Sequence, residues 1–202
     1  MSTTADAAIA ALAAGGLVVF PTETVYGMGV DALSDAAVAR LVAVRGREEG
    51  KAILVLVSDL GMVERVATEI PPAARQLARR FWPGPLTLVL PARAGLPAPL
   101  GAGTGTIGVR VPGHPLAAAL VAGLGRPVTA PSANPPGAPP PRRLDEARTS
   151  FGARVDVYLD GGLLAGGVST VAAVEGERVR VLRAGAVAEE ALHAALEDRS
   201  WR

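Results

Sequence analysis

The sequence predicts an α/β fold with one mixed sheet of parallel and antiparallel strands. Short, fully apolar runs such as Leu17 to Phe20 and Ile53 to Val57 are typical of strands that are buried on both faces. Helical patterns alternate with these runs early in the chain, whereas strands follow one another closely near its end. Since the 202 residues contain no internal repeat and no clean linker, we expect a single domain over residues 1–202.

Capping and stop signals locate the helices. A helix that begins at Thr4 is stopped by Gly15, and Ser34 is a favourable N-cap with Asp35 in the following turn. Proline- and glycine-rich loops are expected at 92–105 and 135–141. In chain order, we expect a helix at 4–14, a strand at 17–20, a helix at 34–44, a strand at 53–57, a helix capped by Ser58 or Asp59, a helix at 71–82, strands at 86–90 and 107–111, a helix at 115–122, strands at 128–130, 155–159, 168–174 and 179–182, and a helix at 188–197.

Composition excludes several classes of protein. The net charge of +1 is too small to indicate a nucleic-acid-binding protein by its electrostatic field alone. Without cysteine, disulfides and thiolate chemistry are excluded, and a cytosolic setting is favoured. No apolar run reaches the roughly 18 residues of a spanning helix, and the alanine-rich start lacks the basic segment of a signal peptide. We therefore expect a cytoplasmic protein without a membrane partner.

Three apparent motifs do not fit their usual context. The stretch Gly103 to Gly108 matches G-x-G-x-x-G, but it precedes a strand instead of opening a helix. The stretch Gly46 to Ala52 resembles a P-loop that is one residue short and lacks Ser or Thr after its lysine. His114 and His193 are far apart, and without cysteine they make no plausible zinc site. We expect no metal-ligating residues.

Polar and cationic side chains gather in loops beside the predicted strands. Each is also explained singly as a turn former or a surface cation, but ligands of open α/β sheets bind at strand ends, where these loops converge. Guanidinium groups hold phosphate oxygens in pairs, lysine acts as a point charge, and hydroxyls complete the shell, so the set predicts polyphosphate binding without a covalent nucleophile. The loops contribute Thr22 and Thr24; Arg45, Arg47 and Lys51; Thr104, Thr106 and Arg110; Ser132 and Asn134; Ser169 and Thr170; and Arg183.

Seven segments together resemble the YrdC-like family, in particular its short, single-domain threonylcarbamoyl-AMP synthases. The resemblance runs in order from about residue 5 to about residue 195. It implies a twisted mixed sheet with helices on its faces and a deep basic cavity. The segments are PTETVYGMG at 21–29, RGR at 45–47, FWPGPLT at 81–87, GVRVP at 108–112, APSAN at 130–134, STV at 169–171 and LRAG at 182–185.

The resemblance implies an ATP-using nucleotidyltransferase. Members of the family join L-threonine, bicarbonate or CO2, and ATP into threonylcarbamoyl-AMP and release pyrophosphate. Mg2+ would be carried by the phosphates of ATP, without a protein cage. The product feeds the threonylcarbamoyl modification of the adenosine beside the tRNA anticodon, so the downstream partner is the tRNA threonylcarbamoyl-transferase machinery. The resemblance also adds tRNA or double-stranded RNA as a further partner.

The resemblance also assigns residues to roles. Three cations would stabilise charge in catalysis, four residues would bind L-threonine and six would bind ATP. Two of the three cations also belong to the ATP-binding group. The catalytic residues are Arg45, Arg47 and Lys51; the threonine-binding residues are Thr24, Arg110, Ala130 and Ser169; the ATP-binding residues are Arg47, Lys51, Thr106, Ser132, Asn134 and Arg183.

Three positions depart from the family pattern. Arg45 stands where members often have lysine, Leu56 where many have a histidine that contacts threonine, and Pro140 where serine is common. These departures bear on the amino-acid substrate more than on ATP. Two alternatives therefore remain: a related protein that uses another carbamoyl substrate, and one that binds double-stranded RNA, tRNA or the ribosome.

Overall fold

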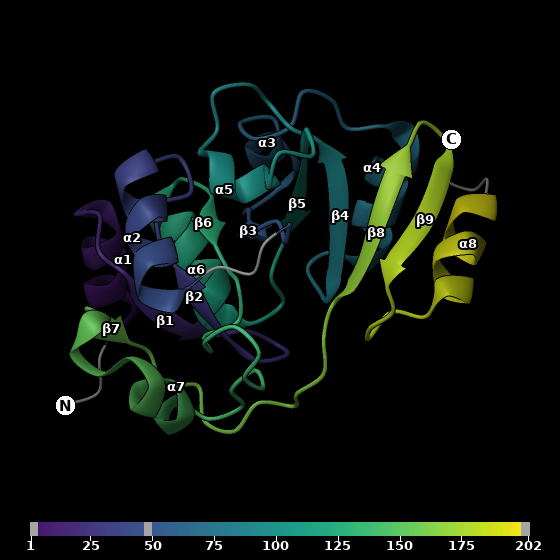
Figure 1. Cartoon of the computed structure of the whole chain (residues 1–202). Coiled ribbons are helices and arrows are strands. Elements are labelled where there is room, and N and C mark those ends of the chain that lie inside the picture. Colours follow the sequence, from purple (N-terminus) through teal and green to yellow (C-terminus); the bar gives the residue numbers. More distant parts are fainter. Residues whose placement is uncertain (1–3, 47–49, 199–202) are drawn as a thin grey trace.

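The computed structural model describes residues 4–46 and 50–198 of the chain. It confirms the mixed α/β fold, but it divides the strands into two sheets where the sequence predicts one. A small sheet has the order β2-β1-β7 and a large sheet the order β6-β3-β5-β4-β8-β9 (Figure 1). The sheets adjoin near Val30 and Thr129. There the Thr129 N–H donates to the Val30 carbonyl, but the Val30 N–H donates to Thr129 Oγ1 at 3.0 Å, so a side chain interrupts the backbone ladder.

The small sheet is covered by two helices. Its central strand β1 (Val18–Pro21) pairs antiparallel with β2 (Tyr26–Gly29) and parallel with β7 (Val157–Tyr158). Helices α1 (Ala5–Ala13) and α6 (Pro115–Leu124) pack against each other and contact this sheet. Their buried side chains form the smaller of two hydrophobic clusters, which includes Leu12, Phe20, Leu120 and Val121.

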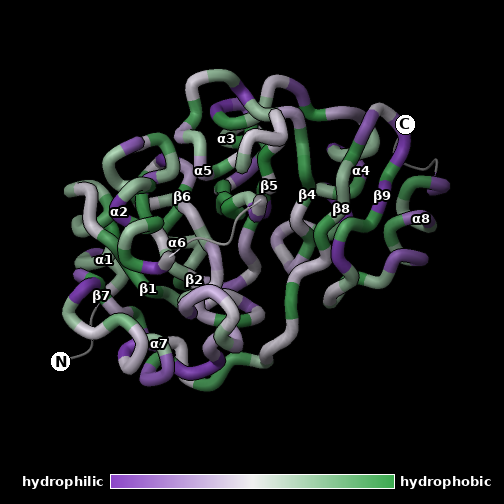
Figure 2. Tube along the Cα trace, viewed as in Figure 1, coloured by the Kyte–Doolittle hydropathy of each residue, from purple (hydrophilic) through white to green (hydrophobic). Residues whose placement is uncertain are grey.

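The large sheet carries most of the core. Strand β5 (Thr106–Arg110) pairs antiparallel with β4 (Leu86–Pro91) and parallel with β3 (Val55–Leu56). Interior strands are hydrophobic along their length, whereas the edge strand β9 alternates hydrophilic and hydrophobic residues, as expected of a strand with one solvated face (Figure 2). The remaining strands are β6 (Val128–Thr129), β8 (Thr170–Glu175) and β9 (Arg178–Arg183).

The predicted helix caps are confirmed. The side chain of Ser34 accepts the N–H of Ala37, and of the two candidates for the next cap, Asp59 is the residue that accepts from Met62. Thr4, predicted as the first helical residue, is instead the N-cap of α1 and accepts the N–H of Ala7. Two other helices, α4 and α8, pack against each other near the edge strand β9 (Figure 1). Besides α1 and α6, the helices are α2 (Asp35–Arg45), α3 (Leu60–Val63), α4 (Pro72–Phe81), α5 (Ala98–Gly101), α7 (Leu144–Phe151), a 3-10 turn at Gly152–Arg154, and α8 (Glu189–Glu197).

Three elements were not predicted from the sequence. Strand β2 contains two glycines and follows a loop, α5 lies inside a proline- and glycine-rich segment, and α7 buries only a few side chains of a polar stretch. The glycines of β2 have a packing reason. A Cβ on Gly29 would lie 2.6 Å from a ring carbon of Phe20, so the close approach of β2 to β1 requires glycine there.

Across the described residues, none of the helices is long and apolar enough to cross a membrane.

Candidate functional site

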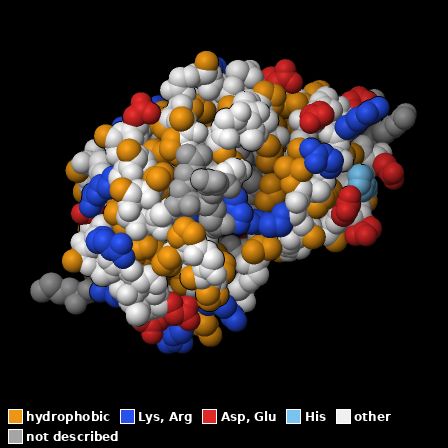
Figure 3. Space-filling view, in the orientation of Figure 1, with side chains coloured by type: hydrophobic (Ala, Val, Ile, Leu, Met, Phe, Trp, Pro, Cys, Tyr) orange, Lys and Arg blue, Asp and Glu red, His pale blue; other side chains and the backbone are white. Residues whose placement is uncertain are grey.

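A cavity of about 410 Å3 opens where loops from both sheets meet. Its wall is formed by the loop between β1 and β2, the segment leading into β3, the end of β5, the loop after β6, and the segment leading into β8. Lys and Arg side chains gather in a hollow at the centre of the face shown in Figure 3. The predicted convergence of strand-end loops is therefore observed, as expected for an α/β fold.

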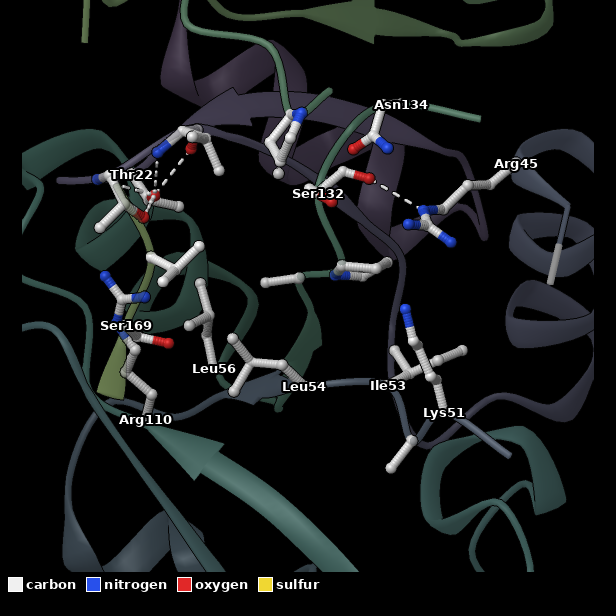
Figure 4. A pocket seen from close by; sticks show the side chains of 18 of the residues that line it. Thr22, Arg45, Lys51, Ile53, Leu54, Leu56, Arg110, Ser132, Asn134 and Ser169 are labelled. Carbon is white, nitrogen blue, oxygen red and sulfur yellow. Dashed lines mark hydrogen bonds between the residues drawn. The ribbon is translucent and has the colours of Figure 1, made fainter. Parts of the chain in front are cut away.

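The polar side chains fall into two groups on opposite sides of an apolar floor. In the close-up of Figure 4, Thr22, Arg110 and Ser169 lie on one side, Arg45 and Lys51 lie on the other, and Leu54 and Leu56 lie between them. We call the first group, with Thr24 and Arg183, the Arg110 end. We call the second group, with Ser132 and Asn134, the Lys51 end. The residues of both ends line the same cavity.

A buried ion pair fixes the position of Arg110, which is 2% exposed. Its Nη2 lies 2.5 Å from Glu23 Oε1, and its Nε donates to the Gly84 carbonyl at 3.0 Å. Glu23 Oε1 also accepts the N–H of Gly113 at 3.1 Å. Burial raises the pKa of Glu23, but the charge and hydrogen bond of Arg110 outweigh it, so this pKa lies below its ordinary value. The ion pair is therefore charged at neutral pH and holds the guanidinium at the cavity wall.

Arg183 reaches the same end of the cavity from the last residue of β9. Its Nε and Nη2 donate to the Ser169 carbonyl at 3.2 and 3.0 Å, and Nη2 also donates to Ser169 Oγ at 3.1 Å. Burial lowers the pKa of Arg183, and the positive charge of Arg110 lowers it further. Two neighbouring guanidinium groups at one end of a cavity favour an anionic ligand group there.

The threonine hydroxyls at this end present acceptors to the cavity. Thr22 Oγ1 donates to the Val25 carbonyl at 2.7 Å and lies 3.0 Å from Thr24 Oγ1. Because the Thr22 proton is used on that carbonyl, Thr24 is the donor within the pair, and its lone pairs remain for a ligand. An ammonium or hydroxyl group of a ligand would match them.

The Lys51 end is formed by cations from a helix terminus and a loop. Arg45 is the last residue of α2, and its Nε donates to the Ser132 carbonyl at 2.8 Å, which ties the loop after β6 to the helix. Lys51 is the only lysine in the sequence, and it is exposed where it lines the cavity. Arg47, which the resemblance assigns to catalysis and ATP binding, lies outside the described residues.

Asn134 is held in one orientation by the proline-rich loop. Its Nδ2 donates to the carbonyls of Pro135 at 2.9 Å and Ala138 at 2.7 Å, so both amide hydrogens are used. Among the described residues, its enclosed Oδ1 has no hydrogen-bond partner. A ligand donor, such as a hydroxyl or an exocyclic amino group, would satisfy this oxygen.

All but two of the residues to which the resemblance assigns roles line this one cavity, whereas Thr104 and Thr170 of the wider polar set do not. Arg47 is outside the described residues, and Thr106 is not among the lining residues. Thr106 begins β5, whereas Arg110 ends it, so the two lie roughly 13 Å apart along the strand. The Thr106 hydroxyl instead lies 2.7 Å from that of Thr104.

Sequence reasoning missed the apolar part of the lining. Leu54 forms part of the floor, and Val168 contributes from the segment before β8. A buried apolar residue beside a ligand has the same sequence pattern as one in the core, so only Val168, next to the predicted Ser169, had a usable signal.

The histidines remain outside the cavity lining. His114 caps α6, because its Nδ1 accepts the N–H of Leu116 at 3.2 Å. Burial lowers the pKa of His114, partly opposed by the negative charge of Glu23. His193 is exposed on α8 beside Glu189. Within residues 4–46 and 50–198, no group of three or more His, Cys, Asp or Glu side chains is placed to hold a metal ion.

Comparison with known proteins gives the class of this fold and site. The sequence profile of the Sua5/YciO/YrdC family, described as "Telomere recombination", matches residues 10–185. A Mycobacterium tuberculosis protein named "Putative threonylcarbamoyl-AMP synthase" is 42% identical over 186 residues, which cover 91% of this chain and 84% of that protein. A Pyrococcus abyssi protein named "Threonylcarbamoyl-AMP synthase" is 42% identical over 148 residues, covering 73% of this chain.

A solved structure agrees with these matches. The crystal structure of P. abyssi Sua5 complexed with L-threonine superimposes with a TM-score of 0.91 at 36% identity, covering 96% of this chain and 57% of that one. The chain belongs to the Sua5/YciO/YrdC family, which confirms the resemblance read from its sequence. It spans 44% of the length of the P. abyssi sequence relative.

Proposed function

We propose that this protein is an L-threonylcarbamoyladenylate synthase, a nucleotidyltransferase that forms threonylcarbamoyl-AMP and pyrophosphate from L-threonine, bicarbonate or CO2, and ATP. The observation that carries the proposal is a single cavity with two differently equipped ends. One end offers two guanidinium groups and hydroxyl acceptors, which suit a hydroxy amino acid. The other offers cations and a free amide oxygen, which suit a nucleotide. The names of the relatives support the same reaction.

L-threonine would bind at the Arg110 end. Its carboxylate would receive hydrogen bonds from the guanidinium that Glu23 holds in place, and Thr24 would accept from its ammonium or hydroxyl group. Ala130 and Ser169 also line the cavity. Leu56, which is fully buried, would contact the methyl group. An apolar side chain is compatible with that contact, so Leu56 does not exclude threonine.

ATP would bind at the Lys51 end. Lys51 and Arg47 would contact phosphate oxygens, Arg45 would add positive charge while holding the Ser132 loop, and Asn134 Oδ1 would accept from the nucleoside. Arg183 belongs to the Arg110 end, so its contact with the nucleotide would be made where the two substrates meet. Thr106 does not line the cavity and is left out of this ATP-binding set. Mg2+ would accompany ATP on its phosphates.

The reaction would proceed in two steps inside the cavity. The threonine amine adds to CO2 and releases a proton, which gives a carbamate. A carbamate oxygen then attacks the α-phosphorus of ATP in line, and pyrophosphate leaves. The cations at the Lys51 end stabilise the charge that moves onto pyrophosphate, and the enclosed cavity keeps water from the carbamate. The product would pass to the tRNA threonylcarbamoyl-transferase machinery.

The proposal is tested by incubating the protein with ATP, bicarbonate and each of the twenty amino acids. We expect pyrophosphate release that depends on both L-threonine and bicarbonate, with threonylcarbamoyl-AMP detected by mass spectrometry. Arg47→Ala should reduce this release strongly if Arg47 contacts the phosphates. Release supported equally by another amino acid would favour a different carbamoyl substrate. No release, together with RNA binding that weakens steeply with salt, would favour an RNA-binding protein.

A further inference from the structure

Glu23 is a partly buried residue, 21% exposed, to which the proposed reaction assigns no substrate contact. It lies between the two lining threonines of the β1–β2 loop, but its own side chain is not part of the cavity wall. Its Oε1 contacts Arg110 Nη2 and accepts the N–H of Gly113. Among the described residues, its enclosed Oε2 has no hydrogen-bond partner.

Glu23 changes the charge that the Arg110 end presents to a ligand. Arg110 and Arg183 bring two positive charges, close enough for Arg110 to lower the pKa of Arg183. No Asp or Glu lines the cavity among the described residues, so Glu23 is the carboxylate in contact with this end. The Arg110 end therefore carries one net positive charge instead of two.

With Glu23 in contact with Arg110, zwitterions and polyanions differ in their electrostatic energy of binding at this end. A ligand oxygen bound to the other side of the Arg110 guanidinium would lie roughly 7 Å from Glu23 Oε1, since the 2.5 Å ion-pair contact, the guanidinium and a second bond of about 2.8 Å separate them. At that distance in a low-dielectric wall, charges interact strongly. An amino acid carries a carboxylate and an ammonium, so repulsion of one is largely offset by attraction of the other. Inorganic phosphate carries only negative charge, and Glu23 repels all of it.

We propose that Glu23 is a specificity-determining residue that reserves the Arg110 end for an amino-acid zwitterion and excludes phosphate groups from it. The inference rests on the proposed function, because it assumes that an amino acid binds at that end. In a cavity that also binds a triphosphate and releases pyrophosphate, this exclusion keeps phosphate groups from occupying the amino-acid position.

The test is competition between L-threonine and inorganic phosphate. Binding of radiolabelled L-threonine to the full chain is measured by equilibrium dialysis without ATP, at constant ionic strength, with phosphate as the competitor. Phosphate bound only at the Lys51 end does not displace threonine, so the readout is specific to the Arg110 end. The variants are Glu23→Gln, which keeps an oxygen acceptor for Arg110 and Gly113, Glu23→Asp, and the exposed control Glu69→Gln.

We expect the inhibition constant of phosphate to fall at least tenfold in Glu23→Gln, while the dissociation constant of L-threonine changes less than about threefold. Glu23→Asp keeps the charge but withdraws it by one methylene, so its phosphate constant should fall by a smaller factor, at least twofold. That variant supplies the readout if Glu23→Gln does not fold. Glu69→Gln should match wild type in both constants.

Three outcomes would overturn the inference. A phosphate constant within twofold of wild type in a folded Glu23→Gln would show that its charge excludes nothing. An equal or larger fall in Glu23→Asp would indicate a lost contact instead of a lost charge. Both results leave the proposed function standing, whereas wild-type protein that binds no L-threonine would remove the proposed function and this inference together.

Discussion

The Arg110 end of the cavity is anchored in the sheets, whereas the Lys51 end is assembled from a helix terminus and loops. Arg110 and Arg183 are the final residues of β5 and β9, and each is hydrogen-bonded to backbone carbonyls. Arg45 ends α2, and Lys51 lies exposed in the segment before β3. At the first end Arg110 and Ser169 are buried although Arg183 is exposed, whereas at the second end Arg45 is half-buried and Lys51 is exposed.

This difference matches what two unlike ligands require. A small amino acid is recognised by a few fixed contacts, so its site needs buried groups whose positions are set before binding. A triphosphate carries several charges spread over a longer molecule, and cations on loops can adapt to it. The comparison predicts that substitutions at the Arg110 end affect stability and threonine, and that those at the Lys51 end affect ATP.

The largest effect is expected on stability, from Glu23→Ala. Removal of Glu23 leaves the buried Arg110 charge uncompensated, which costs about 3 kcal/mol or more. Arg40→Ala breaks a half-exposed ion pair with Asp156 and should cost less than about 1 kcal/mol. Urea unfolding monitored by circular dichroism gives both values. Equal costs for the two substitutions would contradict the distinction between a buried and an exposed pair.

The ion pair between Glu23 and Arg110 also makes the free energy of unfolding depend on pH. The pKa of Glu23 in the folded protein lies below its ordinary value of 4.5, so the ion pair contributes its full stability above that value. As pH falls through the lowered pKa, the carboxylate is protonated and the contribution is lost. The difference in unfolding free energy between wild type and Glu23→Ala should be constant at neutral pH and shrink below about pH 4.5. A difference that grows on acidification would contradict this.

A second effect is expected on threonine use, from Arg110→Lys. Lysine keeps the charge but cannot hold Glu23, the Gly84 carbonyl and a ligand carboxylate at once. We expect kcat/KM for L-threonine to fall about 100-fold, with KM for ATP within about threefold of wild type. Arg126→Lys, at an ion pair with Asp31 outside the cavity lining, serves as the control. If KM for ATP rose as much as KM for L-threonine, the two ends would not bind the two substrates separately.

A third effect, about tenfold, is expected on the chemical reactivity of Lys51. Because it is the only lysine, an amine-acylating reagent should modify Lys51 and the chain terminus alone, and peptide mass spectrometry separates the two. Saturating ATP should slow acylation of Lys51 about tenfold by contact with phosphate, and L-threonine should change it less than twofold. If L-threonine slowed the acylation of Lys51 as much as ATP does, the amino acid would bind at the Lys51 end, which would contradict this account.

The smallest effect is expected from Arg45→Lys. Arg45 Nε donates to the Ser132 carbonyl, and a lysine ammonium can replace one hydrogen bond but not the planar fork. The charge is retained, so KM for ATP should rise about threefold, a loss of roughly 0.7 kcal/mol. Steady-state kinetics at saturating threonine measures this change. A loss of more than 100-fold would mean that Arg45 contacts the reacting phosphates directly.

Several features could be predicted from the sequence because their signals are local. The caps Ser34 and Asp59 follow from side-chain chemistry at helix starts, and the hydroxyls and cations of the site follow from polar residues beside apolar strands. The division into two sheets could not be predicted. At the junction the Thr129 hydroxyl replaces a backbone carbonyl opposite Val30, and such a contact between distant segments has no sequence pattern.

The contacts between residues of the site also could not be predicted from the sequence. Glu23 lies between two predicted site threonines, but its contact with Arg110 joins positions in different loops. The half-buried Leu54 and the buried Leu56 belong to the floor of the cavity, although their pattern is that of ordinary strand residues. Thr106 shows the opposite case, because it shares β5 with Arg110 but begins the strand at its far end.

Equilibrium binding of L-threonine without ATP tests the two-ended cavity most directly. The three proteins to compare are wild type, Ser169→Ala and Lys51→Ala, since both substituted residues line the cavity at different ends. Loss of the Ser169 hydroxyl, which Arg183 contacts, should weaken threonine binding about tenfold, and loss of Lys51 should change it less than twofold. Equal weakening in both variants would contradict two separate ends.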